Sequence, residues 1–329
     1  MSYKLLFFLF AFFVSVQLRA QVYQSREPLA HTFSIVARDE HTGELGVGVQ
    51  SHWFSVGTAV SWAEAGVGAV ATQSFVNKSF GLRGLELMKK GMNAQQALEA
   101  LLKEDNGREV RQVAIVDRDG NVAAHTGKNC IQHASHIQGV AFSVQSNMML
   151  NDKVNKAMAD AFTKSVGKPL AERILLALEA AQAVGGDIRG QQSAALLIVP
   201  GASEGKPWDE RTVDLRVDDA TQPLKELRRL LKVHTAYQHM NNGDLAIEQN
   251  DMKKAMEEYS AAMKMMPANL EMQYWTAITL ANNKQLEKAL PIFQKVFAQD
   301  KNWKELTRRL PAVSLLSVSD ADLKKILAL

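Results

Sequence analysis

Residues 31–74, HTFSIVARDEHTGELGVGVQSHWFSVGTAVSWAEAGVGAVATQS, decide the fold class of this chain. Residues 32–37 are an apolar, β-branched run, residues 39–44 are a polar turn, and residues 45–51 are a returning apolar run. Two such runs on either side of a turn are typical of paired β-strands. Glycines inside the returning run mark a place where another backbone or a ligand approaches closely. The stretch therefore predicts the sheet around which the chain is arranged.

The N-terminal residues have the layout of a secretory signal peptide. Lys4 gives a positive lead, residues 5–16 are apolar, and Ala20 is a small residue suited to cleavage. The apolar run is short for a membrane span, although an uncleaved anchor is the alternative. We expect a signal peptide over residues 1–20, a linker over residues 21–30, and an exported protein, periplasmic or secreted, with no stable membrane span after signal cleavage.

Composition excludes several classes of function. Lys and Arg total 38 against 35 Asp and Glu, a net charge of +3 that is too small to indicate binding to nucleic acid. Cys130 is the only cysteine, so no disulfide can form within the chain, and a buried apolar role is favoured over a nucleophilic one. The eight His residues match no metal-ligand spacing. We therefore expect neither a metal nor a cofactor.

The order of predicted elements indicates an α+β domain over residues 31–232. Runs of strands alternate with runs of helices, which favours two sheets packed face to face with helices outside rather than a βαβ fold. From about Gln238 the composition changes to helical residues rich in Met, Ala and Lys, with no strand signals. The sequence therefore predicts a second, all-α domain over residues 236–329.

The second domain contains a repeat of 34 residues. Ala255 and Tyr259 recur as Ala289 and Phe293 at this spacing, and Gly243 lies at a position where paired helices need a small residue. These positions match a tetratricopeptide unit, in which small residues let two helices approach and an aromatic ring fills the gap between them. A plain helical hairpin is the alternative interpretation.

Two groups of residues are candidates for chemistry. Thr32 opens the first strand, and a threonine at a chain N-terminus can use its own α-amine as the base, although threonine is also an ordinary strand residue. The loop GGDIRGQQS, residues 185–193, combines glycines with polar side chains. Asp187 and Arg189 can pair there, and the amide of Gln191 can donate to an oxyanion. The alternative is a helix C-cap followed by a tight turn, which would explain the glycines of this loop but not its polar side chains.

Several motifs resemble a bacterial family of unknown function, DUF1028, which is classed with the N-terminal nucleophile (Ntn) hydrolase superfamily. They are HTFSIVARD, TGELGVGVQSHWFSVG, EAGVGAVATQS, VDRDG, GGDIRGQQSAALLIV, and VDLRVDD with PLKELRRLL. The resemblance implies a four-layer αββα sandwich, followed here by the small tetratricopeptide-like domain. By position it makes Thr32 the nucleophile, and a second cut between His31 and Thr32 is then required after signal cleavage.

The leading hypothesis is an exported Ntn-type amidohydrolase that cleaves a C–N amide bond in a small or peptide-like substrate. The expected catalytic residues are Thr32, Asp187 and Arg189. The expected substrate-binding residues are Ser51, His52, Glu64, Gln191, Gln192 and Ser193. The main alternative is a non-catalytic binding protein whose tetratricopeptide-like domain engages a peptide or an envelope partner, and a smaller one is hydrolysis through Ser51 or Ser193 without processing. A homo-oligomer is compatible with the sequence.

Overall fold

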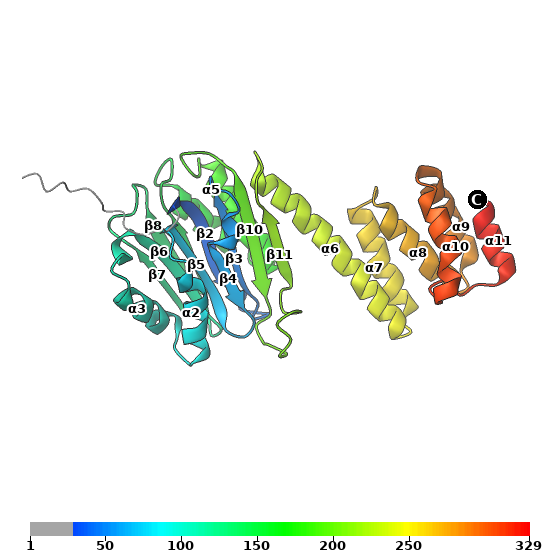
Figure 1. Ribbon diagram of the computed structural model, residues 1–329, viewed down its shortest axis with the longest axis horizontal. Coiled ribbons are helices and arrows are strands. Elements are labelled where there is room, and N and C mark those ends of the chain that lie inside the picture. The colour runs from blue at the N-terminus through cyan, green and yellow to red at the C-terminus, as the bar shows by residue number, and fades with distance from the viewer. Residues whose placement is uncertain (1–28) are drawn as a thin grey trace, which may run out of the picture.

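The computed structural model describes residues 29–329, a layered α/β domain followed by a row of helices (Figure 1). The signal peptide expected over residues 1–20 lies outside the described residues, as does the linker expected over residues 21–30 except for its last two residues. Those two, Leu29–Ala30, form the short strand β1. In the part of the chain that is described, no helix has both the length and the apolar character needed to cross a membrane.

Two antiparallel sheets form the first domain. The six-stranded sheet has the order β11-β10-β3-β2-β9-β8. Its strands are β2 (Thr32–Arg38), β3 (Leu45–Ser51), β8 (Ser135–Gly139), β9 (Phe142–Ser146), β10 (Ser193–Val199) and β11 (Val213–Val217). The five-stranded sheet has the order β1-β5-β6-β7, and β4 also pairs with β5. Its remaining strands are β4 (Ser61–Glu64), β5 (Gly68–Phe75), β6 (Arg111–Asp117) and β7 (Val122–Thr126).

The two sheets face each other across an apolar layer. Alternate side chains of a strand point to opposite faces of its sheet, so every second residue of each strand can enter this layer. The layer contains apolar residues from both sheets, most of them small or β-branched, among them Val36, Val47, Val49, Ala71, Ala114, Val116 and Leu197. Short side chains of this kind let the sheets pack closely.

Helices cover the outer faces of both sheets. The helices α2 (Ser79–Lys89) and α3 (Ala94–Glu104) pack against the five-stranded sheet. The helices α4 (Val154–Lys164) and α5 (Leu170–Ala183) pack against the six-stranded sheet. The expected combination of sheets and helices in the first domain, followed by a helical part, is confirmed.

The helical part begins with α6 (Pro223–Glu248), which belongs to both domains (Figure 1). Buried residues of its first half join the core of the six-stranded sheet, and those of its second half join a core shared with α7. The division expected between residues 232 and 236 therefore falls inside one continuous helix. The remaining helices are α7 (Met252–Met265), α8 (Leu270–Asn282), α9 (Leu286–Gln299), α10 (Asn302–Arg309) and α11 (Asp320–Ala328).

Candidate functional site

The layer between the sheets changes from apolar to polar toward one end of the strands. On β2, Thr32, Ser34 and Val36 lie at every second position, so their side chains point to the same face of the sheet. Val36 belongs to the apolar layer, and Ser34 and Thr32 come before it toward the start of the strand. Ser34 Oγ donates a hydrogen bond of 2.6 Å across the layer to Gln73 Oε1 on β5. Gln73 Nε2 in turn donates to Gln112 Oε1 on β6, at 2.7 Å. A buried network of amides and hydroxyls therefore replaces the aliphatic core at this end.

The chain crosses from one sheet to the other at His31. Ala30 pairs with Ser74 in the five-stranded sheet, whereas Thr32 pairs with Ser51 in the six-stranded sheet. The peptide bond between His31 and Thr32 therefore lies within the polar end of the domain. Thr32 is fully buried, and its Oγ1 donates to the carbonyl oxygen of Ala30 at 2.9 Å.

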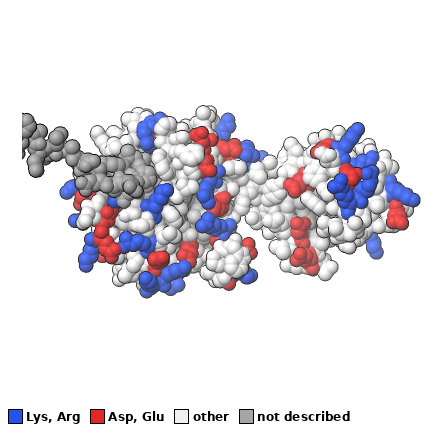
Figure 2. All heavy atoms as spheres, in the orientation of Figure 1, with Lys and Arg blue, Asp and Glu red and all other residues white. Residues whose placement is uncertain are grey.

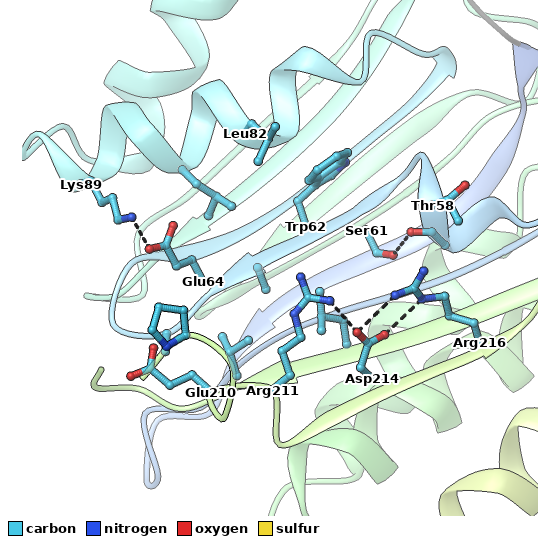
Figure 3. A pocket seen from close by; sticks show the side chains of 17 residues that line it. Thr58, Ser61, Trp62, Glu64, Leu82, Lys89, Glu210, Arg211, Asp214 and Arg216 are labelled. Carbon is cyan, nitrogen blue, oxygen red and sulfur yellow. Dashed lines mark hydrogen bonds and ion pairs between the residues drawn. The ribbon is translucent and has the colours of Figure 1, made fainter. Parts of the chain in front are cut away.

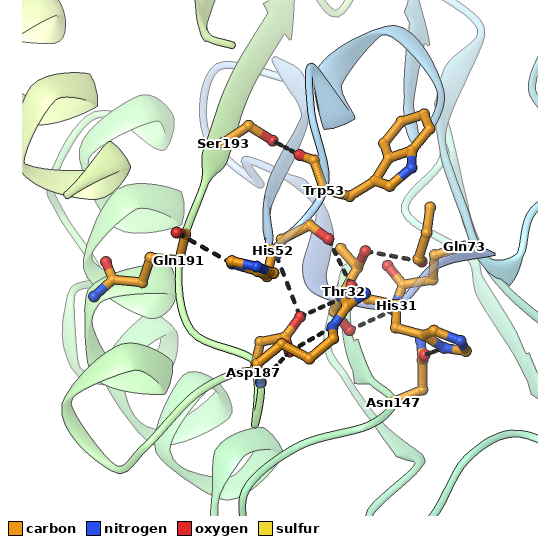
Figure 4. Close-up of polar contacts among 12 residues, drawn as sticks. His31, Thr32, His52, Trp53, Gln73, Asn147, Asp187, Gln191 and Ser193 are labelled. Atoms are coloured by element: carbon orange, nitrogen blue, oxygen red, sulfur yellow. Dashed lines mark hydrogen bonds and ion pairs between the residues drawn. The ribbon is translucent and has the colours of Figure 1, made fainter. Parts of the chain in front are cut away.

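The carbonyl oxygen of His31 accepts two hydrogen bonds from side chains (Figure 4). Ser51 Oγ donates one at 2.6 Å, and Arg189 Nη2 donates the other at 2.7 Å. One donor is neutral and the other is charged, and both are aimed at the peptide bond that precedes Thr32. Two donors that converge on one carbonyl oxygen polarise that carbonyl.

Asp187 fixes the orientation of Arg189. Its Oδ1 accepts from Arg189 Nε at 3.0 Å, and its Oδ2 accepts from Arg189 Nη2 at 2.7 Å. The Asp187 carboxylate is fully buried, and it also accepts from the backbone N–H groups of Arg189 and His52. The loop can turn this tightly because Gly186 and Gly190 have φ angles of 60° and 108°, which favour glycine. The pairing expected between Asp187 and Arg189 is thus present.

The imidazole of His31 lies in a buried setting. Its Nδ1 is 2.5 Å from Asn147 Oδ1, and the ring of Phe75 lies edge-on at 5.7 Å between centroids. Its Nε2 is buried and has no hydrogen-bond partner among the described residues. Burial lowers the pKa of His31, and the bond to Asn147 offsets this only in part, so the neutral ring is favoured.

Sequence analysis missed the amide side chains that complete the network. Asn147 Nδ2 donates to Gln112 Oε1 at 2.8 Å, and Gln73 Nε2 donates to the carbonyl oxygen of Thr32 at 3.2 Å. The signal was present, because Gln73, Gln112 and Gln145 each lie within a predicted strand beside apolar residues. A buried amide in a strand needs a partner, and here the neighbouring strand and the facing sheet both supply one.

The other predicted site residues lie around this cluster or away from it. Ser193 Oγ donates to the carbonyl of Trp53 and accepts from the N–H of Val56, so it holds the segment after β3. His52 is exposed, with Nδ1 3.3 Å from the carbonyl oxygen of Gln191. Gln192 donates from its side chain to Asp219 at 3.3 Å.

Glu64 lies apart from Thr32, at the other end of the sandwich. It ends β4 and forms an ion pair with Lys89 of α2, in a separate cleft. Within residues 29–329, no group of three or more His, Cys, Asp or Glu side chains is arranged as metal ligands. The side chains near Thr32 are hydroxyls, amides, one guanidinium, one carboxylate and the imidazoles of His31 and His52.

A second cavity, of about 450 Å³, lies between α6 and α8 in the helical part. Its apolar wall includes Met240, Trp275 and Ile278. Its charged residues are Asp244 and Glu271, and each accepts a hydrogen bond of 2.6 Å from a tyrosine hydroxyl. No Lys or Arg is among the residues that line it. We call this cavity the helical groove.

Both parts of the chain match known protein families. The model of a family of unknown function (DUF1028) matches residues 32–227, and a tetratricopeptide repeat model matches residues 246–310. A crystal structure of a DUF1028 protein from Silicibacter pomeroyi is similar, with 29% sequence identity and a TM-score of 0.57. The similarity covers 63% of this chain and 87% of that one. The chain has no significant match among curated proteins.

Proposed function

The chain belongs to the DUF1028 family of proteins of unknown function, and we propose that it is an exported amidohydrolase whose N-terminal nucleophile is Thr32. The observation that carries this proposal is the pair of hydrogen bonds from Ser51 and Arg189 to the carbonyl oxygen of His31. Donors arranged in this way stabilise the negative charge that develops on a carbonyl oxygen under attack. The attacked carbonyl would be the one next to Thr32.

The layered architecture supports the same assignment. Two facing antiparallel sheets with helices on both outer faces resemble the αββα sandwich expected of an Ntn hydrolase, in which the nucleophile would begin the first strand. Thr32 begins β2, which has neighbours on both sides in its sheet. A buried start of a strand between two sheets holds a nucleophile rigidly, which favours a precise attack geometry.

The first step of the proposal is cleavage of the bond between His31 and Thr32. Thr32 Oγ1 attacks the carbonyl carbon of His31, and the negative charge develops on the oxygen held by Ser51 and Arg189. The C–N bond breaks, the proton of the hydroxyl passes to the departing nitrogen, and an ester joins His31 to Thr32 Oγ1. Water then hydrolyses the ester, which leaves a carboxylate on His31 and a free α-amine on Thr32.

The freed amine supplies the base that the uncleaved chain lacks. An α-amine with a pKa near 8 can accept the proton of Oγ1 as the oxygen attacks a substrate amide. The same proton then passes to the leaving amine, and water releases the acyl group. Because Ser51 and Arg189 no longer hold His31, they are available to the carbonyl of the substrate.

The departing segment suggests where the substrate would bind. Residues up to His31 occupy the acyl side of the cleaved bond, so the acyl part of a substrate would take their position. The ring of His31 contacts Asn147 and Phe75, one an amide and the other an aromatic edge. We expect a small or peptide-like amide with a polar, planar acyl side chain.

An electrophilic probe tests the nucleophile without a known substrate. A β-lactone opens on an activated hydroxyl and remains attached as an ester, which intact mass detects as one added probe. We expect one adduct on Thr32 of the mature protein, the same adduct on the Thr32→Ser variant, and none on Thr32→Ala. An equal adduct on Thr32→Ala would remove Thr32 from the mechanism, and the alternative hydroxyls of Ser51 and Ser193 would then be mapped.

The helical groove favours a second, separable function, the binding of a basic peptide. Its charged residues, Asp244 and Glu271, are both acidic, and Trp275 supplies a flat apolar wall. Basic side chains pair with carboxylates and stack on aromatic rings.

On the face in Figure 2, acidic and basic side chains are interspersed over the α/β domain rather than gathered in one patch.

Titration with short peptides tests this second function. A lysine-rich peptide with interspersed leucines should bind, and a matched glutamate-rich peptide should not. Glu271→Gln should weaken binding by roughly tenfold, the effect of losing one charged partner. The exposed Glu287→Gln on α9, which is not among the groove residues, serves as the matched control. Equal binding of both peptides would contradict the assignment.

A further inference from the structure

A charged cleft of about 510 Å³ lies where the edge strands of the two sheets meet (Figure 3). β4 is an edge strand of the five-stranded sheet, and β11 is an edge strand of the six-stranded sheet. Helix α2 and the segment before β11 complete the walls. Its volume is in the range of small-molecule sites in proteins. We call it the edge cleft.

Thr32 is not among the residues that line the edge cleft. Thr32 pairs with Ser51, and Ser51 pairs with Ser193 at the start of β10. The edge cleft is lined instead by Leu197 and Val199, at the far end of β10. Binding there would therefore require neither Thr32 nor cleavage of the chain.

One wall of the edge cleft has more positive than negative charge. Arg211 and Arg216 share a single carboxylate, that of Asp214. Arg211 Nη1 donates to Asp214 Oδ2 at 2.6 Å, and Arg216 Nε donates to Asp214 Oδ1 at 3.2 Å. Five N–H groups are available on each guanidinium, so most donors of the pair remain free within the described residues.

The alternation of β11 explains why these charges face the cleft. Val213, Leu215 and Val217 pack into the helix-covered core, so Asp214 and Arg216 point to the other face of the sheet. That face is covered by the second sheet elsewhere, but it is open beside β4. The two arginines keep 54% and 41% of their side-chain surface exposed, which leaves their free donors accessible.

The remaining acidic residues of the edge cleft, Glu64 and Glu210, already have partners of their own. Glu64 forms an ion pair with Lys89 across the upper wall (Figure 3). Glu210 accepts hydrogen bonds from Ser203 Oγ and from the backbone N–H groups of Glu204 and Lys206. Neither carboxylate therefore has a hydrogen bond or ion pair with Arg211 or Arg216 in the described residues, although the charges that line the edge cleft sum to zero.

An apolar surface faces the arginine wall. The indole of Trp62 lies against Gly81 of α2, where a Cβ atom would come within 2.2 Å of the ring. Its Nε1 donates to the carbonyl of Ala59 at 3.0 Å, so the ring is held in one orientation. Leu82 and Leu85 extend this surface along α2.

We propose that the edge cleft binds a small carboxylate ligand with a flat apolar body, the carboxylate at Arg211 and Arg216 and the body against Trp62. A guanidinium recognises a carboxylate through two parallel N–H donors, and two guanidinium groups offer this twice. A ring or short apolar chain on the ligand buries its surface on the indole. Asp214 is the internal competitor for the same donors.

Phenylacetate is the probe, and its neutral analogue phenylacetamide is the control. Binding to the full chain is followed by NMR at the Trp62 indole N–H, identified by its loss in Trp62→Phe. Phenylacetate should give a saturable shift at up to about 10 mM, within the range of weak ligands, and phenylacetamide at least tenfold weaker binding. Thr32→Ala should bind phenylacetate as the wild type does.

Variants of Arg211 and Arg216 should change binding in the opposite direction to a variant of Asp214. Arg211→Gln and Arg216→Gln should each weaken phenylacetate binding about tenfold, whereas Arg229→Gln on α6, outside the cleft, should not change it. Asp214→Asn should tighten binding, because it removes the competing carboxylate. If the charges serve only to protect the sheet edges, no saturable shift occurs in any of these proteins. The absence of a saturable shift would overturn the proposal. Equal binding of phenylacetamide and phenylacetate, or weaker binding in folded Asp214→Asn, would also overturn it.

Discussion

Arg189 Nη2 donates a hydrogen bond of 2.7 Å to the carbonyl oxygen of His31, a residue 158 positions earlier in the chain. This contact joins the glycine-rich loop before β10 to the peptide bond that precedes Thr32. Ser51 supplies the second donor to the same oxygen. The account of function given above depends on this arrangement, and each part of it can be tested.

Removing the neutral donor should slow cleavage of the chain. Ser51→Ala deletes the hydroxyl that bonds the His31 carbonyl, and loss of one such donor typically reduces a rate by about 10² to 10³. The appearance of the new N-terminus is followed over time by intact mass. Ser193→Ala is the matched control, because Ser193 is the strand partner of Ser51 but bonds Trp53 instead. Equal slowing in both variants would indicate a general structural effect.

Breaking the ion pair in the loop should lower stability as well as cleavage. Asp187→Asn leaves Arg189 without its buried carboxylate and frees the guanidinium to move from His31. Loss of one partner of a buried pair costs about 2 kcal/mol or more in free energy of unfolding. Urea denaturation measures the stability, and intact mass measures the cleavage. A variant of unchanged stability that cleaves normally would show that Asp187 does not position Arg189.

The strands and helix starts could be predicted from the sequence where local signals are strong. The strand expected at residues 45–51 has those bounds in the structure, and the run VAAHT after the VDRDG turn, which also predicts a strand, forms β7 over residues 122–126. Asn93 is of a residue type that favours an N-cap, and its side chain accepts from the backbone N–H of Gln96, whose own side chain completes a capping box. Local propensity and period decide such features, so the folded environment is not needed to find them.

Features that depend on contacts between distant segments could not be predicted. The sequence predicts one strand over residues 139–146, but the structure has β8 and β9 joined by a two-residue turn with Ala141 at a φ of 56°. β8 is an edge strand that is mostly exposed, so it has no apolar alternation to reveal it. The contacts of Asn147 and Gln73 likewise arise only once the two sheets face each other.

The free energy of unfolding should depend on pH in part because of His31. Burial lowers the pKa of His31 below 6.5 in the folded chain, so the unfolded chain binds more protons just below that pH. Stability is therefore complete above about pH 6.5, the ordinary pKa of histidine, and falls as the pH decreases through this window. Burial lowers the pKa of His136 and His234 in the same direction.

Comparison of two uncleaved proteins isolates this contribution. Thermal unfolding of Thr32→Ala is measured from pH 7.5 to about pH 5, a range that spans the histidine transition, beside the same protein with His31→Gln. The glutamine variant should lose less stability on acidification, because His136 and His234 contribute equally to both. Parallel curves would mean that His31 is not held in its neutral form.

The helix pair at the start of the repeat region should depend on a single small residue. A Cβ atom on Gly243 of α6 would come within 2.4 Å of the Tyr259 ring on α7. Gly243→Ala should therefore destabilise this region by about 1 to 3 kcal/mol, despite the better helix propensity of alanine. Asn242→Ala, at the exposed neighbouring position, is the control and should be neutral or stabilising. Hydrogen exchange on α6 and α7 gives the measurement, and equal protection in both variants would contradict the packing argument.

The central claim is that the chain is cut between His31 and Thr32. N-terminal sequencing with intact mass, on protein recovered from the envelope or medium of its native host, measures this directly. The account predicts a chain that begins at Thr32 and that is absent from the Thr32→Ala variant. A stable chain that begins at Gln21, with no shorter species on storage, would leave Thr32 without its amine and would contradict the proposed catalysis.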